Sequence, residues 1–198
     1  MKTRALIKET ARSLFNHYGL MNVTLRQVAE SLNKSYGNIT YHYPTKEKLV
    51  EELYADMTEA LKSLAVPDRP LLDFLLMLPE ITFRISLDYL FFFADYVELK
   101  RHYRTLMKRV DKDNRHRMQV WKGMLLKLQA DGLLRADLDD TALDYLMELS
   151  GAVRTFYFQQ HSPVNLSKKA YTAYVNQLLL PYLSAEGLTV YKQHRTSA

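Results

Sequence analysis

The chain has 198 residues, enough for one compact domain or two small ones, and 47% of them are hydrophobic. The absence of cysteine excludes disulfides, thiolate zinc sites and a cysteine nucleophile. The net charge of +5 arises entirely in residues 1–50, which carry eight Lys and Arg against three Glu. The remaining residues carry 19 basic and 19 acidic groups. A basic segment joined to a neutral one suggests a polyanion-binding head on a body with another role, although a solvated basic surface is the alternative.

The N-terminal residues lack the apolar run and the cleavage site of a secretory signal. The most apolar stretch, residues 71–94, is interrupted by charged residues and a proline. A helix that spans a bilayer requires about 20 mostly uncharged residues. We therefore expect a cytoplasmic protein with no membrane partner.

Apolar residues recur at helical spacing along nearly the whole chain, and no segment alternates as a strand, so the sequence predicts an all-α protein. The first helix is predicted to end at Tyr18-Gly19, because glycine takes the left-handed conformation that ends helices. Thr24 is expected to cap a short second helix, with Gln27 as its capping-box partner. Asn33 follows, and asparagine tolerates the positive φ of a tight turn.

Ser35 is expected to cap a third short helix that ends at about Tyr41, and a fourth helix runs from Lys46 to about residue 66. The remainder is predicted as longer helices over about 70–95 with a kink at Pro79, 97–101, 103–130, 138–161 and 165–184. Residues 186–198 are polar and are expected to form a flexible tail.

Residues 24–43 have the proportions of a helix-turn-helix, two short helices joined by a turn of three to four residues. The second helix of such a unit lies in the major groove, with its N-terminal side chains at the base edges. Here only Ile39 is firmly apolar in that helix. The others present amide, hydroxyl and phenol groups that suit bases and phosphates better than a core: Ser35, Tyr36, Asn38, Thr40 and Tyr41.

The run Ser35-Tyr36-Gly37-Asn38-Ile39-Thr40-Tyr41-His42-Tyr43-Pro44-Thr45-Lys46-Glu47-Lys48-Leu49 resembles the signature of TetR-type repressors. In that family a Ser-x-Gly-x-Leu/Ile helix leads to an aromatic pair and then to Ser/Thr-Lys-Glu-x-Leu. The resemblance covers about residues 5–55, with two departures: Asn33 stands at the usual turn glycine, and Thr40 at a frequent tyrosine. It implies an N-terminal three-helix helix-turn-helix DNA-binding domain, joined by a fourth helix to a C-terminal helical ligand-binding and dimerisation domain.

The resemblance also implies that Tyr41, His42 and Lys46 touch DNA phosphates. A helix N-terminus with a lysine is a natural anion site, in agreement with that role for Lys46. Packing between helices is the alternative for these residues, and it is the favoured role of Tyr43. The complete set of candidate DNA-binding residues is Lys2, Arg4, Thr24, Arg26, Ser35, Tyr36, Asn38, Thr40, Tyr41, His42 and Lys46.

The body holds five aromatic residues within 89–96 and further rings beyond residue 120, enough aromatic surface to line a cavity. By resemblance, a small apolar or aromatic effector binds there, and rings that simply fill the core are the alternative. The candidate pocket residues are Phe83, Arg84, Tyr89, Phe92, Phe93, Tyr96, Trp121 and Phe156. The polar residues Arg84, Arg154, Asp88 and Gln159 lie on the same apolar helices and could orient a ligand or satisfy one another.

Apolar stripes in the last two long helices suit a two-fold, four-helix interface between two copies of the chain. The candidate interface residues are Leu146, Leu149, Val153, Tyr171, Tyr174 and Leu178. A homodimer would also place two heads about one helical turn apart, roughly 34–36 Å, so that they read successive major grooves.

The sequence has no Gly-rich phosphate loop, no His-Glu-x-x-His and no Glu-x-x-His pair, so we expect no enzyme activity, cofactor or metal site. The hypothesis is a homodimeric repressor of a double-stranded DNA operator, released by an effector. Its predicted parts are a DNA-binding head (1–46), a connecting helix (46–66), an effector-binding and dimerisation body (67–185) and the tail. The alternatives are a helical small-molecule-binding protein and an adaptor whose head responds to a protein partner.

Overall fold

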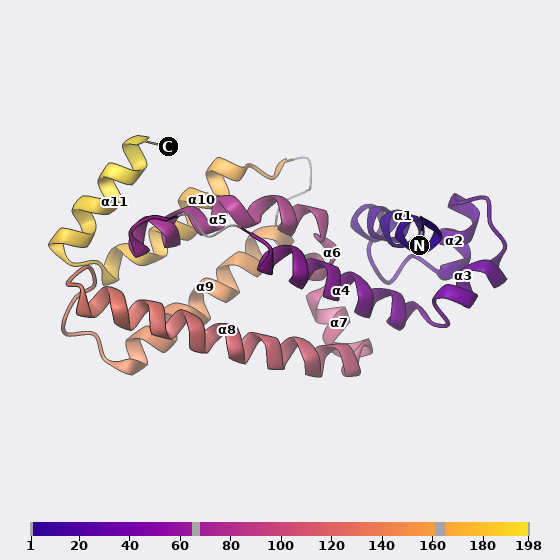
Figure 1. Ribbon diagram of the computed structural model, residues 1–198, viewed down its shortest axis with the longest axis horizontal. Coiled ribbons are helices and arrows are strands. Elements are labelled where there is room, and N and C mark those ends of the chain that lie inside the picture. The colour runs from indigo at the N-terminus through magenta and orange to yellow at the C-terminus, as the bar shows by residue number, and fades with distance from the viewer. Residues whose placement is uncertain (1, 65–67, 161–164, 198) are drawn as a thin grey trace. The chain divides into compact units, whose positions relative to one another are not determined.

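The computed structural model describes residues 2–64, 68–160 and 165–197, without the side chains of Lys2, Thr196 and Ser197. These residues form eleven α-helices and one 3-10 helix, and none of them forms a strand (Figure 1). The prediction of an all-α protein is therefore confirmed. No helix within these three ranges is long and apolar enough to cross a membrane.

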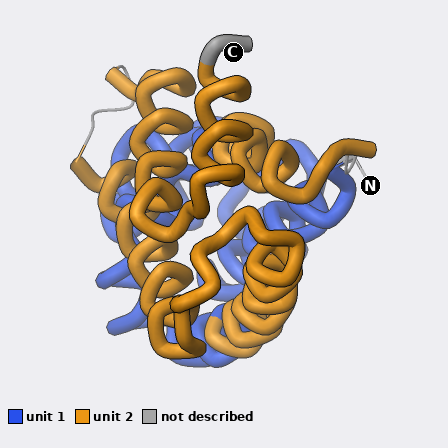
Figure 2. The backbone as a smooth tube through the Cα atoms, turned by 90° about the vertical axis from the view of Figure 1, so that its left-hand side faces the viewer, with its two compact units in different colours: residues 1–64, 85–110 blue, residues 65–84, 111–198 orange. Residues whose placement is uncertain are grey.

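The chain divides into two compact units, coloured blue and orange in Figure 2. Unit 1 comprises residues 1–64 and 85–110, and unit 2 comprises residues 65–84 and 111–198. The division falls inside α5 (Leu71–Asp88) and inside α8 (Arg104–Ala130), so each of these helices contributes to both units.

Unit 1 begins with α1 (Lys2–Tyr18), α2 (Leu25–Ser31), α3 (Tyr36–His42) and α4 (Lys46–Lys62). The predicted capping box is present: the Gln27 N–H donates to Thr24 Oγ1 at 3.2 Å, and the Thr24 N–H donates to Gln27 Oε1 at 2.7 Å. Ser35 caps α3 as predicted. Gly19 and Asn33 have φ of +83° and +51°, which confirms the predicted turn positions.

The core of unit 1 joins these helices to the short α6 (Phe91–Ala94) and α7 (Tyr96–His102). Phe15 of α1 packs edge-on against Phe91, with ring centroids 5.3 Å apart. The sequence predicted one apolar helix over 70–95, but α5 ends at Asp88. The side chain of Asn16 stabilises this break, because its Nδ2 donates to the Asp88 carbonyl at 3.0 Å and its Oδ1 accepts from the Phe91 N–H at 3.0 Å. Pro79 lies inside α5.

Unit 2 contains α5 up to Arg84, α8 from Asp111, and the remaining helices of the chain. These are α9 (Asp140–Gln160), α10 (Lys168–Asn176), the 3-10 helix η2 (Gln177–Tyr182) and α11 (Ala185–Ser197). The core is formed by leucines of α5 and α8 that pack with the buried face of α9: Leu72, Leu75, Leu76, Leu125, Leu128, Leu143, Leu146 and Met147.

The expected flexible tail is instead the helix α11. Ser184 caps it, since the Gly187 N–H donates to Ser184 Oγ at 3.1 Å, and the Ser184 N–H donates to the Leu133 carbonyl at 3.1 Å. Tyr191 is buried in the core of unit 2. Because few apolar residues occur in this polar segment, its sequence alone did not indicate that it packs.

Candidate DNA-binding and effector sites

The helix α3 is anchored by one side chain and exposes most of the others. Ile39 is fully buried, whereas Tyr36 and Asn38 are exposed and Tyr41 is 84% exposed. The Thr40 hydroxyl donates back to the Tyr36 carbonyl at 3.2 Å. Tyr36, Asn38 and Tyr41 are therefore the α3 side chains that are free to reach another molecule.

Aromatic contacts surround these exposed side chains. The Arg26 guanidinium lies 5.6 Å from the ring centroid of Tyr36, and the His42 ring lies 5.1 Å from that of Tyr41. The hydroxyl oxygens of Thr24 and Ser35 accept backbone N–H groups as helix caps. The structure thus brings these predicted residues together on α2, α3 and their caps.

Two other predicted phosphate contacts are engaged within unit 1. Arg4 forms an ion pair with Glu52, and Lys46 donates to the Leu20 carbonyl and lies 5.6 Å from the Phe15 ring centroid. Burial lowers the pKa of Lys46, and the carboxylate of Asp95 partly offsets that effect. Both cations therefore contribute to the fold of the free protein. The side chain of Lys2 lies outside the described residues.

Tyr43 packs inside unit 1, as the sequence favoured. It is 1% exposed, and its hydroxyl donates to Glu52 Oε2 at 2.9 Å. Burial raises its pKa to about 12. Arg4 lies 5.2 Å from the centroid of its ring, so Tyr43 and Glu52 together hold the start of α1 against α4.

The candidate effector residues are shared between the two units. Tyr89, Phe92, Phe93 and Tyr96 belong to unit 1, and Phe83, Arg84, Trp121 and Phe156 belong to unit 2. Tyr89 and Phe92 are core residues of unit 1, with the Phe92 ring 5.7 Å from that of Tyr54. In unit 2, Phe83 packs 5.4 Å from the ring of Tyr171, whereas Phe156 is exposed.

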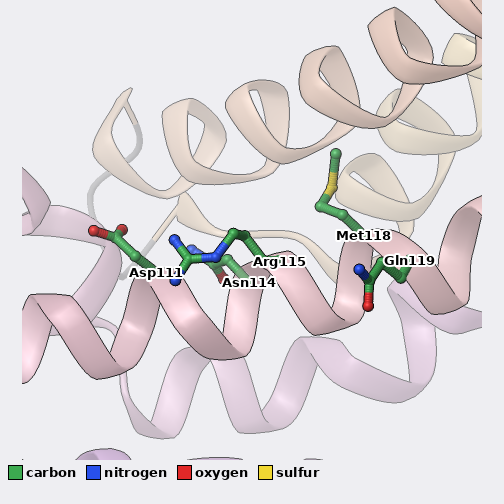
Figure 3. Close-up of a pocket in the computed structure, with 5 residues that line it drawn as sticks. All are labelled: Asp111, Asn114, Arg115, Met118 and Gln119. Carbon is green, nitrogen blue, oxygen red and sulfur yellow. The ribbon is translucent and has the colours of Figure 1, made fainter.

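A hollow of about 450 Å³ lies in unit 2 on α8 (Figure 3). Its lining residues are Asp111, Asn114, Arg115, Met118 and Gln119. The sequence analysis did not name any of them, because four of the five are polar and resemble a solvated helix face. A second hollow, of about 400 Å³, lies in unit 1 and is lined mainly by residues of α1 and α2.

Comparison with protein families covers nearly the whole chain. Residues 7–53 match the family model described as bacterial regulatory proteins, tetR family, and residues 53–191 match the TetR model described as a bacterial transcriptional repressor. The chain belongs to the TetR family. Its function is accordingly that of a DNA-binding transcriptional regulator, and α2 and α3 form its helix-turn-helix.

Solved TetR-family structures share this fold. A regulator from Marinobacter aquaeolei VT8 is 21% identical, with a TM-score of 0.80 over 98% of this chain and 99% of its own. The ketosteroid regulator KstR2 of Mycobacterium tuberculosis is 19% identical, with a TM-score of 0.66 over 92% and 95%. A regulator from Saccharomonospora viridis, solved in complex with choline, is 20% identical, with a TM-score of 0.66 over 92% and 98%. No curated protein sequence matches the chain.

The candidate dimer residues of this TetR-family chain differ in exposure. Leu146 and Tyr171 are buried in unit 2, and Tyr174 is exposed. The others are half-buried: Leu149, Val153 and Leu178. The exposed aromatic residues of α9 are Tyr145 (60% exposed), next to the predicted Leu146, and Phe156 (52% exposed), three residues after the predicted Val153.

Proposed function

We propose that this TetR-family regulator is a homodimeric repressor that binds an operator through α3 and leaves it when a small apolar effector binds the C-terminal body. The observation that carries the proposal is the exposure of the polar and aromatic side chains of α3. One buried residue, Ile39, holds the helix, while the tyrosine Tyr41 is almost fully exposed. A stable fold does not require such a tyrosine.

The exposed groups of α3 suit two kinds of DNA contact. The amide of Asn38 can bond two atoms of an adenine edge, a contact that contributes roughly 1–3 kcal/mol of discrimination. The phenol of Tyr41 can donate to a phosphate, which positions the head without reading sequence. The excess of positive charge in residues 1–50 favours the approach of a polyanion.

Release by an effector is supported by the helices that the two units share. Because α5 and α8 each belong to both units, a ligand that changes either helix in unit 2 acts on a helix that continues into unit 1. The effector would shift the population of the DNA-binding arrangement by its differential affinity for it. The choline complex of the Saccharomonospora viridis regulator is consistent with a small-molecule effector.

The test measures fluorescence anisotropy on DNA taken from upstream of the gene for this protein and on scrambled DNA, at two salt concentrations. We expect preference for the upstream DNA and weaker binding at higher salt. Tyr41→Ala should weaken binding to both DNAs, whereas Asn38→Ala should reduce the preference. Tyr18→Ala is the matched control, because Tyr18 is a 57% exposed tyrosine of unit 1 outside the helix-turn-helix. Full affinity in Tyr41→Ala would contradict the role of α3.

A further inference from the structure

The buried face of α9 contains one positively charged residue. Leu143, Met147 and Phe158 are buried, and Arg154 follows Met147 by seven residues and precedes Phe158 by four. Residues at these spacings share one face of a helix. Arg154 therefore occupies a position of α9 that the hydrophobic pattern assigns to an apolar side chain.

The guanidinium of Arg154 lies against an aromatic ring and is paired with no anion among the described residues. Its carbon is 5.3 Å from the ring centroid of Trp121 in α8. Its Nε is buried and has no hydrogen-bond partner among the described residues, and no described carboxylate forms an ion pair with it. Burial lowers the pKa of Arg154, and the electrostatic effect of Tyr171 partly offsets it. Tyr171 is itself buried, which raises its pKa and keeps it neutral.

An arginine in this state selects for an anionic ligand. The guanidinium remains charged at neutral pH, and a buried Nε–H without a hydrogen-bond partner is unfavourable. The contact with Trp121 leaves the Nε–H of Arg154 without a hydrogen-bond partner among the described residues. The Nε–H and an adjacent Nη–H of a guanidinium are parallel, and they match the two oxygens of a carboxylate.

The surroundings of Arg154 indicate an apolar body for such a ligand. The rings of Tyr157, Phe158 and Tyr171 lie 5.0–5.9 Å from one another in unit 2. On α8, Met118 precedes Trp121 by three residues and so lies on the same face, and it lines the hollow of about 450 Å³ (Figure 3).

We propose that unit 2 binds a carboxylic acid with an apolar body, whose carboxylate pairs with Arg154 and whose body lies along Trp121 toward Met118. The inference rests on the proposed function, because it identifies this acid with the effector that releases the repressor from DNA. It adds the ligand's chemical class and the residue that selects it.

The test uses Trp121 as a reporter, because it is the only tryptophan of the chain. The full chain is titrated with phenylacetate and octanoate and with the matched neutral amides, phenylacetamide and octanamide. We expect a saturable change in tryptophan fluorescence with at least one acid and no saturation with its amide. Arg154→Met should weaken binding of that acid by roughly 10- to 100-fold, the effect of losing a charge-assisted hydrogen-bonded pair. Arg154→Lys should also weaken it, since an ammonium does not reproduce the paired N–H groups.

Lys127→Met is the matched control. Lys127 lies on the helix of Trp121 but is exposed and paired with Asp131, so its loss should leave the affinity unchanged. Arg154→Met should melt at or above the wild-type temperature, because it removes a buried N–H group that has no hydrogen-bond partner among the described residues. Equal responses to acid and amide, no saturable response to either acid, or unchanged affinity in both Arg154 variants would each overturn the inference.

Operator binding, followed in parallel by anisotropy, separates this inference from the proposed function. Specific DNA binding without a response to the acids contradicts the inference alone. Binding of an acid through Arg154 without any specific DNA binding supports the carboxylate site and contradicts the proposed function.

Discussion

Gly37 is the second residue of α3, and a Cβ added there would have no heavy atom within 4 Å. Neither a left-handed conformation nor a close neighbour among the described residues requires glycine at this position. A glycine in a helix is nevertheless destabilising by about 0.5–1 kcal/mol relative to alanine. Its presence on the exposed DNA-binding helix is explained if the backbone of α3 approaches DNA closely.

We expect Gly37→Ala to increase the free energy of unfolding by about 0.5 kcal/mol and to weaken operator binding. Urea denaturation and fluorescence anisotropy measure the two effects. Gly123→Ala in α8 is the control, because its added Cβ is equally unobstructed and should stabilise without changing DNA affinity. If Gly37→Ala bound the operator as tightly as wild type, the hypothesis that the α3 backbone approaches DNA closely at Gly37 would be wrong.

Single residues were predictable where their role is local. The cap at Thr24 and the turn at Asn33 depend on neighbours within four positions, so the sequence pattern was sufficient. The contact of Lys46 with the Leu20 carbonyl depends on the packing of α1 against α4, which no local pattern records. The buried Nε of Arg154, which has no hydrogen-bond partner among the described residues, likewise depends on the packing of α8 against α9.

At the scale of helices, the boundary between α5 and α6 depends on a residue far away in the chain. Asn16 of α1 donates to the carbonyls of Leu87 and Asp88 and accepts from the Phe91 N–H. The apolar pattern of residues 70–95 continues through this point, so it predicted one helix. A break whose backbone groups are bonded by a side chain more than 70 positions earlier cannot be read from local periodicity.

We expect Asn16→Ala to destabilise unit 1 by about 2–3 kcal/mol, because it leaves partly buried backbone groups at the break without partners. Urea denaturation followed by far-UV circular dichroism measures the change. Asn22→Ala is the control, since Asn22 is exposed and its side chain donates to the carbonyl of Tyr18, only four residues away, at 2.8 Å. An effect no larger than that of the control would show that the break does not depend on Asn16.

The packing of α11 depends on a close approach of Gly187 to the backbone of Leu133, which the composition of residues 186–198 did not indicate. A Cβ added at Gly187 would overlap the carbonyl oxygen of Leu133. We expect Gly187→Ala to destabilise the docking of α11 by about 1–3 kcal/mol, as overpacking does. Faster amide hydrogen exchange in residues 185–197 would report the loss. Gly151→Ala in α9, where the added Cβ meets nothing within 4 Å, should instead leave this exchange unchanged.

At the scale of the whole molecule, the aromatic residues predicted to line one effector cavity are divided between the two units. The aromatic run of residues 89–96 suggested one effector cavity, but Phe91 and Phe92 complete the core of unit 1, together with Phe15 and Tyr54. The sequence could not assign the run, because aromatic side chains at consecutive positions point in all directions around a helix. Helical spacing was sufficient for the fold class. The two short helices with their turn and the TetR-like run of residues 35–49 were sufficient for the helix-turn-helix, since these are features of contiguous segments.

The proposed homodimer makes the exposed apolar face of α9 the region to test. Tyr145, Leu149 and Phe156 lie on one side of α9, at spacings of four and seven residues, and Tyr145 and Phe156 are more than half exposed. We expect Phe156→Glu to shift the protein toward the monomer, because an interface would bury the introduced carboxylate without a partner. Loss of a central aromatic contact costs about 2 kcal/mol or more, so the dimer dissociation constant should rise by at least roughly 30-fold.

Sedimentation velocity over a concentration series measures that constant, and anisotropy on the same samples measures operator binding. If two heads must bind together, the Phe156→Glu operator affinity should fall and become strongly dependent on protein concentration. Val120→Glu supplies the matched control, because Val120 is a 45% exposed apolar residue on α8 rather than α9. A Phe156→Glu protein that remained dimeric would move the interface away from this face of α9. A monomeric variant with wild-type operator affinity would instead show that one head is sufficient, and the two-fold reading of the operator would be wrong.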